Sequence, residues 1–141
     1  MRILGLDIGD KRIGLALSDP EGLLASPLTI IERSNDGEDV KVIAAIVERE
    51  QAGKVIVGMP RSLSGSLGEQ AEKVKDFADK LAHVIKIPFE FRDERLSTVS
   101  AERLMREART KKSPRKQPVR RDAVAAAIIL QSYLDEVRDQ R

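Results

Sequence analysis

The chain has 141 residues, a formal net charge of +2, 41% hydrophobic residues and only 3% aromatic residues, which suits one domain with an aliphatic core. It has no Cys and one His, which excludes disulfides, thiolate metal sites and His-rich zinc sites. Any metal would need carboxylate ligands, which points to Mg²⁺ or Mn²⁺. Because we see no signal peptide and no apolar run near the ~20 residues of a membrane span, we expect a cytoplasmic protein without a membrane partner.

The first part of the chain is predicted to form three antiparallel strands. Residues 2–8 and 12–18 are two mostly apolar runs, and the short polar turn between them contains Gly9. This spacing is typical of a β-hairpin. A turn rich in Pro, Gly and acidic residues follows, and residues 28–31 are expected to add the third strand.

The middle of the chain alternates between helical and extended patterns. Apolar residues at helical spacing predict an amphipathic helix over 38–51, which Gly53 is expected to end. Residues 54–58 include three consecutive β-branched residues and predict an internal strand buried on both faces. A second helix is predicted from 66 to about 83. Strand alternation over 87–91, with a proline near the start, predicts a fifth strand at an edge of the sheet.

The last part is predicted to contain two helices separated by a basic segment. Ser97 or Thr98 is suited to cap a helix over the residues that follow. Residues 109–121 hold seven Lys or Arg and no acidic residue, and we expect them to form a mobile basic loop. The segment from Asp122 to about 137 is predicted to be a helix packed on the sheet, because its first half is apolar all round.

This order of elements predicts the fold class. Three antiparallel strands followed by alternating strands and helices indicate an α/β fold with one mixed sheet and helices on its faces. We expect residues 1–141 to form a single domain.

Asp7 is the most unusual residue of the first strand. Its neighbours Leu6 and Ile8 are expected to be buried, and a buried carboxylate is costly unless a cation compensates it. Asp7 is therefore either a metal-binding or phosphate-handling residue at the centre of a site, or a strand-end residue bonded to turn amides.

Further carboxylates are predicted at the same rim of the sheet. Asp93 and Glu94 follow the fifth strand, and Asp122 starts the last helix. Ligand sites of α/β sheets form at the carboxyl ends of the strands. Together with Asp7 these carboxylates would repel one another, and a divalent cation would relieve that repulsion and activate water for phosphodiester hydrolysis.

Each of these carboxylates also has a local explanation. Asp93 and Glu94 could form a surface salt-bridge cluster with their neighbours Arg92 and Arg95. Asp122 could be the N-cap of the last helix, where a carboxylate is favoured.

Positive charge beside the carboxylates favours a nucleic acid as the partner. The basic run over 109–121 directly precedes Asp122, which fits contact with a phosphate backbone better than a purely solvated loop. The candidate nucleic-acid-binding residues are Lys11, Arg12, Arg95, Lys111, Lys112, Arg115, Lys116, Arg120 and Arg121.

Four segments taken together closely resemble the YqgF family. They are residues 7–14 (DIGDKRIG), 57–60 (VGMP), 93–98 (DERLST) and 122–130 (DAVAAAIIL), and the match covers nearly the whole chain in order. This family of bacterial pre-16S rRNA nucleases is also described as Holliday-junction-resolvase-like. The resemblance implies a ribonuclease H-like fold, with a five-stranded mixed sheet of order 3-2-1-4-5, strand 2 antiparallel and helices on both faces.

The resemblance also implies an activity and its residues. It implies a metal-dependent endonuclease that processes the 5′ end of pre-16S rRNA during ribosome biogenesis. Asp7, Glu94 and Asp122 would bind Mg²⁺ or Mn²⁺, with Asp93 as a further catalytic candidate beside Glu94. Related junction resolvases carry an acidic residue on the fourth strand, whereas here that strand ends in Gly58-Met59-Pro60, so one metal ion or two are both open.

Three other functions stay open at this stage. A Holliday junction resolvase would act on branched DNA as a symmetric dimer; the sequence reveals no dimer interface, so we expect a monomer or a weak homodimer. An actin-like kinase or ATPase shares the Asp-x-Gly start but normally needs two such domains. A non-catalytic assembly factor would bind structured RNA without cutting it.

Overall fold

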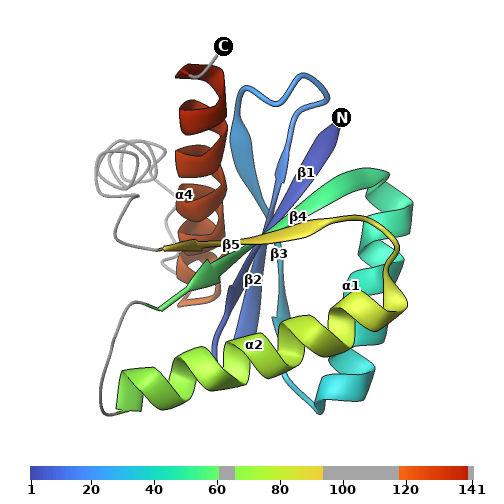
Figure 1. Cartoon of the computed structure of the whole chain (residues 1–141), viewed down its shortest axis with the longest axis vertical. Coiled ribbons are helices and arrows are strands. Elements are labelled where there is room, and N and C mark those ends of the chain that lie inside the picture. The colour runs from blue at the N-terminus through green and yellow to red at the C-terminus, as the bar shows by residue number, and fades with distance from the viewer. Residues whose placement is uncertain (61–65, 94–117, 140–141) are drawn as a thin grey trace.

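One mixed sheet organises the molecule. The computed structural model describes residues 1–60, 66–93 and 118–139 (Figure 1). Its strands are β1 (Arg2–Ile8), β2 (Arg12–Ser18), β3 (Ala25–Glu32), β4 (Ala52–Met59) and β5 (Phe89–Asp93). They form a five-stranded sheet of order β3-β2-β1-β4-β5, in which β2 is antiparallel to β1 and to β3, while β4 is parallel to β1 and to β5. The predicted strand order and directions are confirmed.

Helices cover both faces of this sheet, as expected. The described helices are α1 (Asp36–Glu50), α2 (Ser66–Val84) and α4 (Pro118–Asp139). Among the described helices, α1 and α2 lie on one face and α4 lies on the other (Figure 1). None of the described helices is long and apolar enough to cross a membrane.

The two faces have separate apolar cores because successive strand residues point in opposite directions. In β1, Leu4 and Leu6 belong to the core shared with α1 and α2, whereas Ile3 belongs to the core shared with α4. In β4, Val55 and Val57 face the first core and Ile56 faces the second. The strand is therefore buried on both faces, as predicted.

Two helix boundaries differ from those predicted. Helix α1 ends before Gln51, which adopts a left-handed conformation with φ of 56° and donates its N–H to carbonyls of the last turn, so Gly53 is part of β4 and does not end the helix. Helix α4 begins at Pro118 rather than at Asp122, because proline is well suited to the first helical turn, where its missing N–H needs no partner.

The predicted basic loop, 109–121, therefore extends too far at its C-terminal end. Residues 118–121 are helical, and Asp122 lies one turn inside α4, so the N-cap explanation for Asp122 is wrong. The rest of the predicted loop, 109–117, and the helix predicted after Thr98 lie outside the described residues.

A partly buried arginine fixes the turn of the β1–β2 hairpin. Arg33 donates from Nη1 to the carbonyl of Gly9 (3.0 Å) and from Nε to Oδ2 of Asp39 (2.9 Å). Asp39 lies in the first turn of α1 and its side chain is only 2% exposed. Arg33 also donates from Nη2 to Asp36 (2.6 Å). The segment that follows Asp7 is therefore held against the N-terminus of α1.

Removing this buried partner should destabilise the fold. Asp39→Ala leaves the half-buried guanidinium of Arg33 without its main carboxylate, and we expect a loss of about 3–5 kcal/mol in the free energy of unfolding, measured by urea denaturation. The matched control is Arg49→Ala, because Arg49 is 63% exposed and pairs with Glu50 on the surface of α1. The control should stay within about 0.5 kcal/mol of the unsubstituted protein. A loss below about 1 kcal/mol in Asp39→Ala would contradict the anchoring role of the pair.

Candidate active site

Asp7 faces α4. It has the same strand parity as Ile3 and Gly5, and a Cβ added to Gly5 would lie 2.9 Å from Cβ of Leu130 and 3.1 Å from the carbonyl oxygen of Ala126, both on α4. Asp7 is partly buried at the carboxyl end of β1. Its carboxylate therefore starts from the sheet face that α4 covers.

Asp122 is brought to the same place by a glycine. Gly14 is the register partner of Asp7 in the β1–β2 pair. A Cβ on Gly14 would overlap the carbonyl group of Asp122, so the backbone of α4 lies directly on β2 beside Asp7. The structure thus places Asp7 and Asp122, which are far apart in sequence, at neighbouring positions on one face of the sheet.

Arg12 adds a positive charge to this rim. It precedes Gly14 by two residues and therefore also faces α4. Its Nη1 lies 3.7 Å from Oδ2 of Asp122, and its Nε lies 3.5 Å from Oε1 of Glu32, its register partner on β3. The side chains of Arg12 and Asp122 are 36% and 35% exposed, so solvent reaches this ion pair. Lys11 is exposed at the preceding turn.

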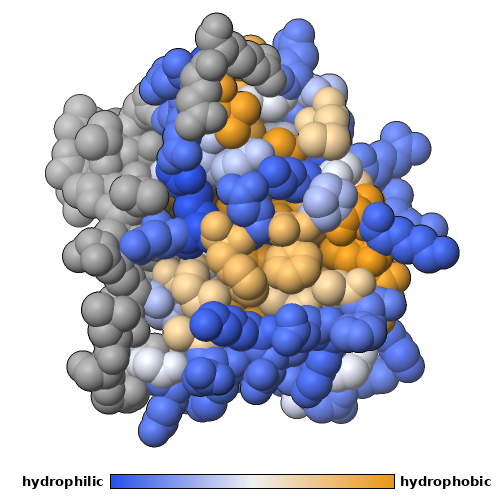
Figure 2. All heavy atoms as spheres, in the orientation of Figure 1, coloured by the Kyte–Doolittle hydropathy of each residue, from blue (hydrophilic) through white to orange (hydrophobic). Residues whose placement is uncertain are grey.

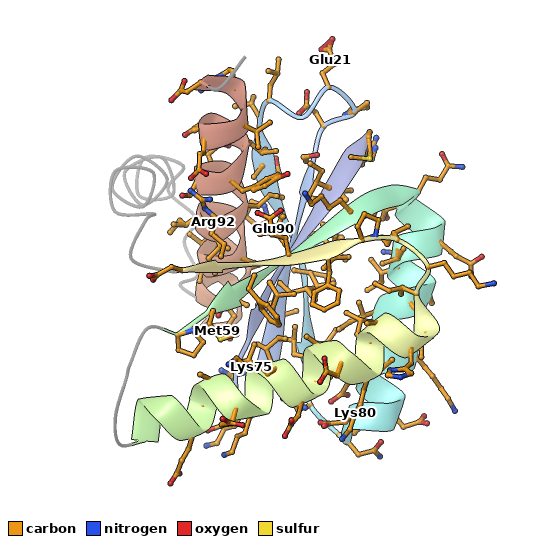
Figure 3. The ribbon with its side chains drawn as sticks, viewed as in Figure 1. Glu21, Met59, Lys75, Lys80, Glu90 and Arg92 are labelled. Atoms are coloured by element: carbon orange, nitrogen blue, oxygen red, sulfur yellow. The ribbon has the colours of Figure 1, made fainter. Side chains whose placement is uncertain are left out.

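The end of β5 is fastened to α4 by a second arginine. Arg92 is 9% exposed, donates from Nε to Oγ of Ser132 (3.1 Å) and donates from Nη2 to Oε2 of Glu136 (2.6 Å). Figure 3 shows Arg92 and Glu90 on the side of β5 that faces α4. The hydrogen bond from Arg92 holds the pKa of Glu136 below its ordinary value. Arg92 is therefore part of the packing against α4. It does not belong to the surface salt-bridge cluster that was the local explanation for Asp93.

Asp93 starts from the opposite face of the sheet. It has the strand parity of Phe89 and Phe91, whose rings meet edge to face at 5.4 Å, and Phe89 packs against the core on the α1–α2 side. Figure 2 shows apolar side chains exposed between β5 and α2, bordered by hydrophilic side chains of α2, and Phe91 is 37% exposed. Strand alternation therefore separates Asp93 from Asp7 and Asp122.

Several predicted site residues are not described. Glu94, Arg95, Lys111, Lys112, Arg115 and Lys116 lie outside the described residues, and Arg120 and Arg121 belong to the first turn of α4, without described side chains.

The described carboxylates fit a hard divalent cation but do not complete its ligand set. Asp7 and Asp122 offer oxygen donors of the kind that Mg²⁺ and Mn²⁺ prefer. Within 1–60, 66–93 and 118–139, no group of three or more His, Asp or Glu side chains is arranged to hold a metal ion. Any third carboxylate ligand would come from outside these ranges.

Sequence reasoning missed the two residues that hold the rim in place. Arg33 and Arg92 both have their guanidinium groups in the packing between elements. A signal for Arg33 was present, because Asp39 shares a helical face with the buried Ile43 and Ile46, where a carboxylate needs a cationic partner.

Comparisons with known proteins agree with this architecture. The family model described as "RuvX: Holliday junction resolvase" matches residues 1–136. A protein of Caldanaerobacter subterraneus subsp. tengcongensis named "Putative pre-16S rRNA nuclease" is 47% identical over 140 residues, covering 99% of each chain. One of the same name from Halothermothrix orenii is 47% identical over 135 residues, covering 96% of this chain and 95% of the relative.

Solved structures are similar in fold at low sequence identity. Thermus thermophilus RuvC in complex with a Holliday junction substrate superposes with a TM-score of 0.73 at 16% identity, covering 99% of this chain and 96% of that one. The fowlpox virus Holliday junction resolvase superposes with a TM-score of 0.60 at 15% identity, covering 96% and 99%.

A side chain at Gly14 should push α4 off the sheet. We expect Gly14→Ala to lower the free energy of unfolding by about 1–3 kcal/mol, as overpacking does, because the added methyl group meets backbone that has no rotamer to change. The matched control is Gly68→Ala in α2, where an added Cβ meets no atom of the described residues within 4 Å. The control should gain about 0.5–1 kcal/mol from helix propensity. Equal urea midpoints for the two variants would disprove the close contact at Gly14.

Proposed function

The chain belongs to the RuvX family, and from this membership we propose that it is a divalent-metal-dependent endonuclease that processes the 5′ end of pre-16S rRNA. That the chain is a nuclease follows from its family and from the relatives at 47% identity. The observation that supports the proposed site is the approach of Asp122 to Asp7 across Gly14.

The residues at this rim of the sheet would have two roles, metal binding and contact with the phosphate backbone. Asp7 and Asp122 would hold Mg²⁺ or Mn²⁺, which when bound activates water and neutralises charge at the phosphate. Arg12 and Lys11 would contact the phosphate backbone, and the basic residues that precede α4 would extend this contact along the RNA.

Glu94 is the better candidate for the third carboxylate. On β5, Arg92 faces α4 and Asp93 has the opposite parity, so the side chain of Asp93 starts from the sheet face away from Asp7 and Asp122. Glu94 is the other carboxylate that follows this strand in the sequence. We therefore assign Glu94 to the metal site together with Asp7 and Asp122, and leave Asp93 outside it.

Branched DNA is the alternative substrate. The matching family model is described as a Holliday junction resolvase, and the fold is that of junction resolvases. Symmetric cutting of a junction would require a dimer. The relatives at 47% identity carry an rRNA nuclease name, which favours RNA.

The test uses two substrates in parallel. Purified protein is incubated with RNA spanning the 5′ junction of pre-16S rRNA or with a four-way DNA junction, in Mg²⁺, Mn²⁺ or a chelator. We expect metal-dependent cutting of the RNA, reduced more than about 100-fold in Asp7→Asn and in Asp122→Asn, since each removes a metal ligand. Asp10→Asn is the matched control, because Asp10 is 65% exposed at the hairpin turn and pairs with Lys73.

The outcomes separate the candidate functions. Cutting of the junction alone would assign the chain to the resolvases. Cutting of RNA that persists in chelator, or that Asp10→Asn loses as fully as Asp7→Asn, would contradict the proposed metal site.

The parity argument makes its own prediction for the two acids after β5. Glu94→Gln should lose more than about 100-fold in cleavage rate, while Asp93→Asn should stay within about tenfold of the unsubstituted protein. Both variants remove one negative charge at adjacent positions, so each serves as the control for the other. The reverse order of effects would show that Asp93 is the ligand.

A further inference from the structure

Arg12 has two competing carboxylate partners. Its guanidinium lies between Asp122 on α4 (3.7 Å) and Glu32 at the end of β3 (3.5 Å). The Glu32 side chain is 76% exposed, whereas that of Asp122 is 35% exposed. The pairs therefore differ in solvation, and Arg12 is shared between a residue of the proposed metal site and a residue outside it.

The hydrogen bonding of Arg12 is incomplete. Its Nε is buried and has no hydrogen-bond partner among the described residues, although Glu32 lies at ion-pair distance. A buried donor without an acceptor is unfavourable. This contrasts with Arg33, whose Nε, Nη1 and Nη2 all donate at 3.0 Å or less. Arg12 would gain from an acceptor with better geometry, whereas Arg33 is already satisfied where it lies.

A cation that binds Asp122 must compete with Arg12 for the same carboxylate. We propose that Arg12 pairs with Asp122 in the RNA-free, metal-free chain, and that it leaves Asp122 for a phosphate of the substrate when a divalent cation binds. Glu32 competes for Arg12 and so sets the strength of the Arg12–Asp122 ion pair. Arg12 is thus a positioning residue that acts through Asp122. This inference rests on the proposed metal-dependent function.

The proposal predicts that the affinity for the cation changes in opposite directions when the charge of Arg12 and the charge of Glu32 are removed. Without the Arg12 charge, Asp122 is available, and the cation should bind more tightly. Without the Glu32 charge, Asp122 is the one carboxylate partner left to Arg12 among the described residues, and the cation should bind more weakly. A purely structural role for either side chain would weaken binding in both variants.

The test measures Mn²⁺ binding to the full chain without RNA, from the electron paramagnetic resonance signal of free Mn²⁺. We expect Arg12→Gln to lower the Kd about twofold to fivefold and Glu32→Gln to raise it by a similar factor, the range of half-exposed ion pairs. Arg12→Lys keeps the charge and should stay near the unsubstituted value. Lys41→Gln is the control for loss of one positive charge, because Lys41 pairs with Glu38 on the opposite side of the sheet.

RNA binding in chelator is the second readout. Arg12→Gln should bind the pre-16S RNA more weakly, with the salt dependence reduced by about one phosphate contact, although it binds Mn²⁺ more tightly. Thermal unfolding of each variant identifies any that are misfolded. If Arg12→Gln is misfolded, Arg12→Lys replaces it in the RNA measurement, and its RNA affinity should fall because it loses the planar guanidinium.

The outcomes distinguish this inference from the function on which it rests. If the unsubstituted chain binds no Mn²⁺, both the metal-dependent function and this inference are wrong. If it binds Mn²⁺ but Arg12→Gln and Glu32→Gln shift the Kd in the same direction, or not at all, this inference alone is overturned.

Discussion

The direct contact of α4 with the sheet backbone is the constraint on which the site depends. Gly5 and Gly14 carry no side chain at the two points where α4 crosses β1 and β2, so helix and strand approach more closely than any other residue would allow. That approach brings Asp122 beside the register position of Asp7. The two carboxylates are thus joined by backbone packing, and their position does not rely on flexible side chains.

Three arginines have different roles around this contact: Arg92 is buried, Arg33 is partly buried and Arg12 is half-exposed. Arg33 ties the hairpin turn after Asp7 to α1, and Arg92 ties the end of β5 to α4. Each makes hydrogen bonds to a neighbouring element and is less exposed than Arg12, which suits a rigid frame. Arg12 is more exposed and has a donor without an acceptor among the described residues, which suits a group that changes partner.

The sheet was predictable because each strand has a clear local pattern. For Asp7 and Asp122, the sequence predicted only that both lie at the same rim of the sheet, and not that they are neighbours across Gly14. The start of α4 was misplaced because the charges of residues 118–121 suggested a loop, although Pro118 is a favourable first residue of a helix. The inward position of Arg92 could not be recognised, since its partners on α4 are 40 and 44 residues away in sequence. The sequence grouped Asp93 with Glu94, and only the pleat of β5 shows that Asp93 starts from the sheet face opposite to that of Asp7.

The central claim is that Asp7 and Asp122 act as one site, and a double-mutant cycle on RNA cleavage tests it most directly. Rates are compared for the unsubstituted chain, Asp7→Asn, Asp122→Asn and the double variant at saturating Mn²⁺. If both residues serve one metal centre, the double variant should be no slower than the more damaged single variant, because the shared function is already lost. If the two losses multiply, the residues act independently, and the account of a joint site across Gly14 is contradicted.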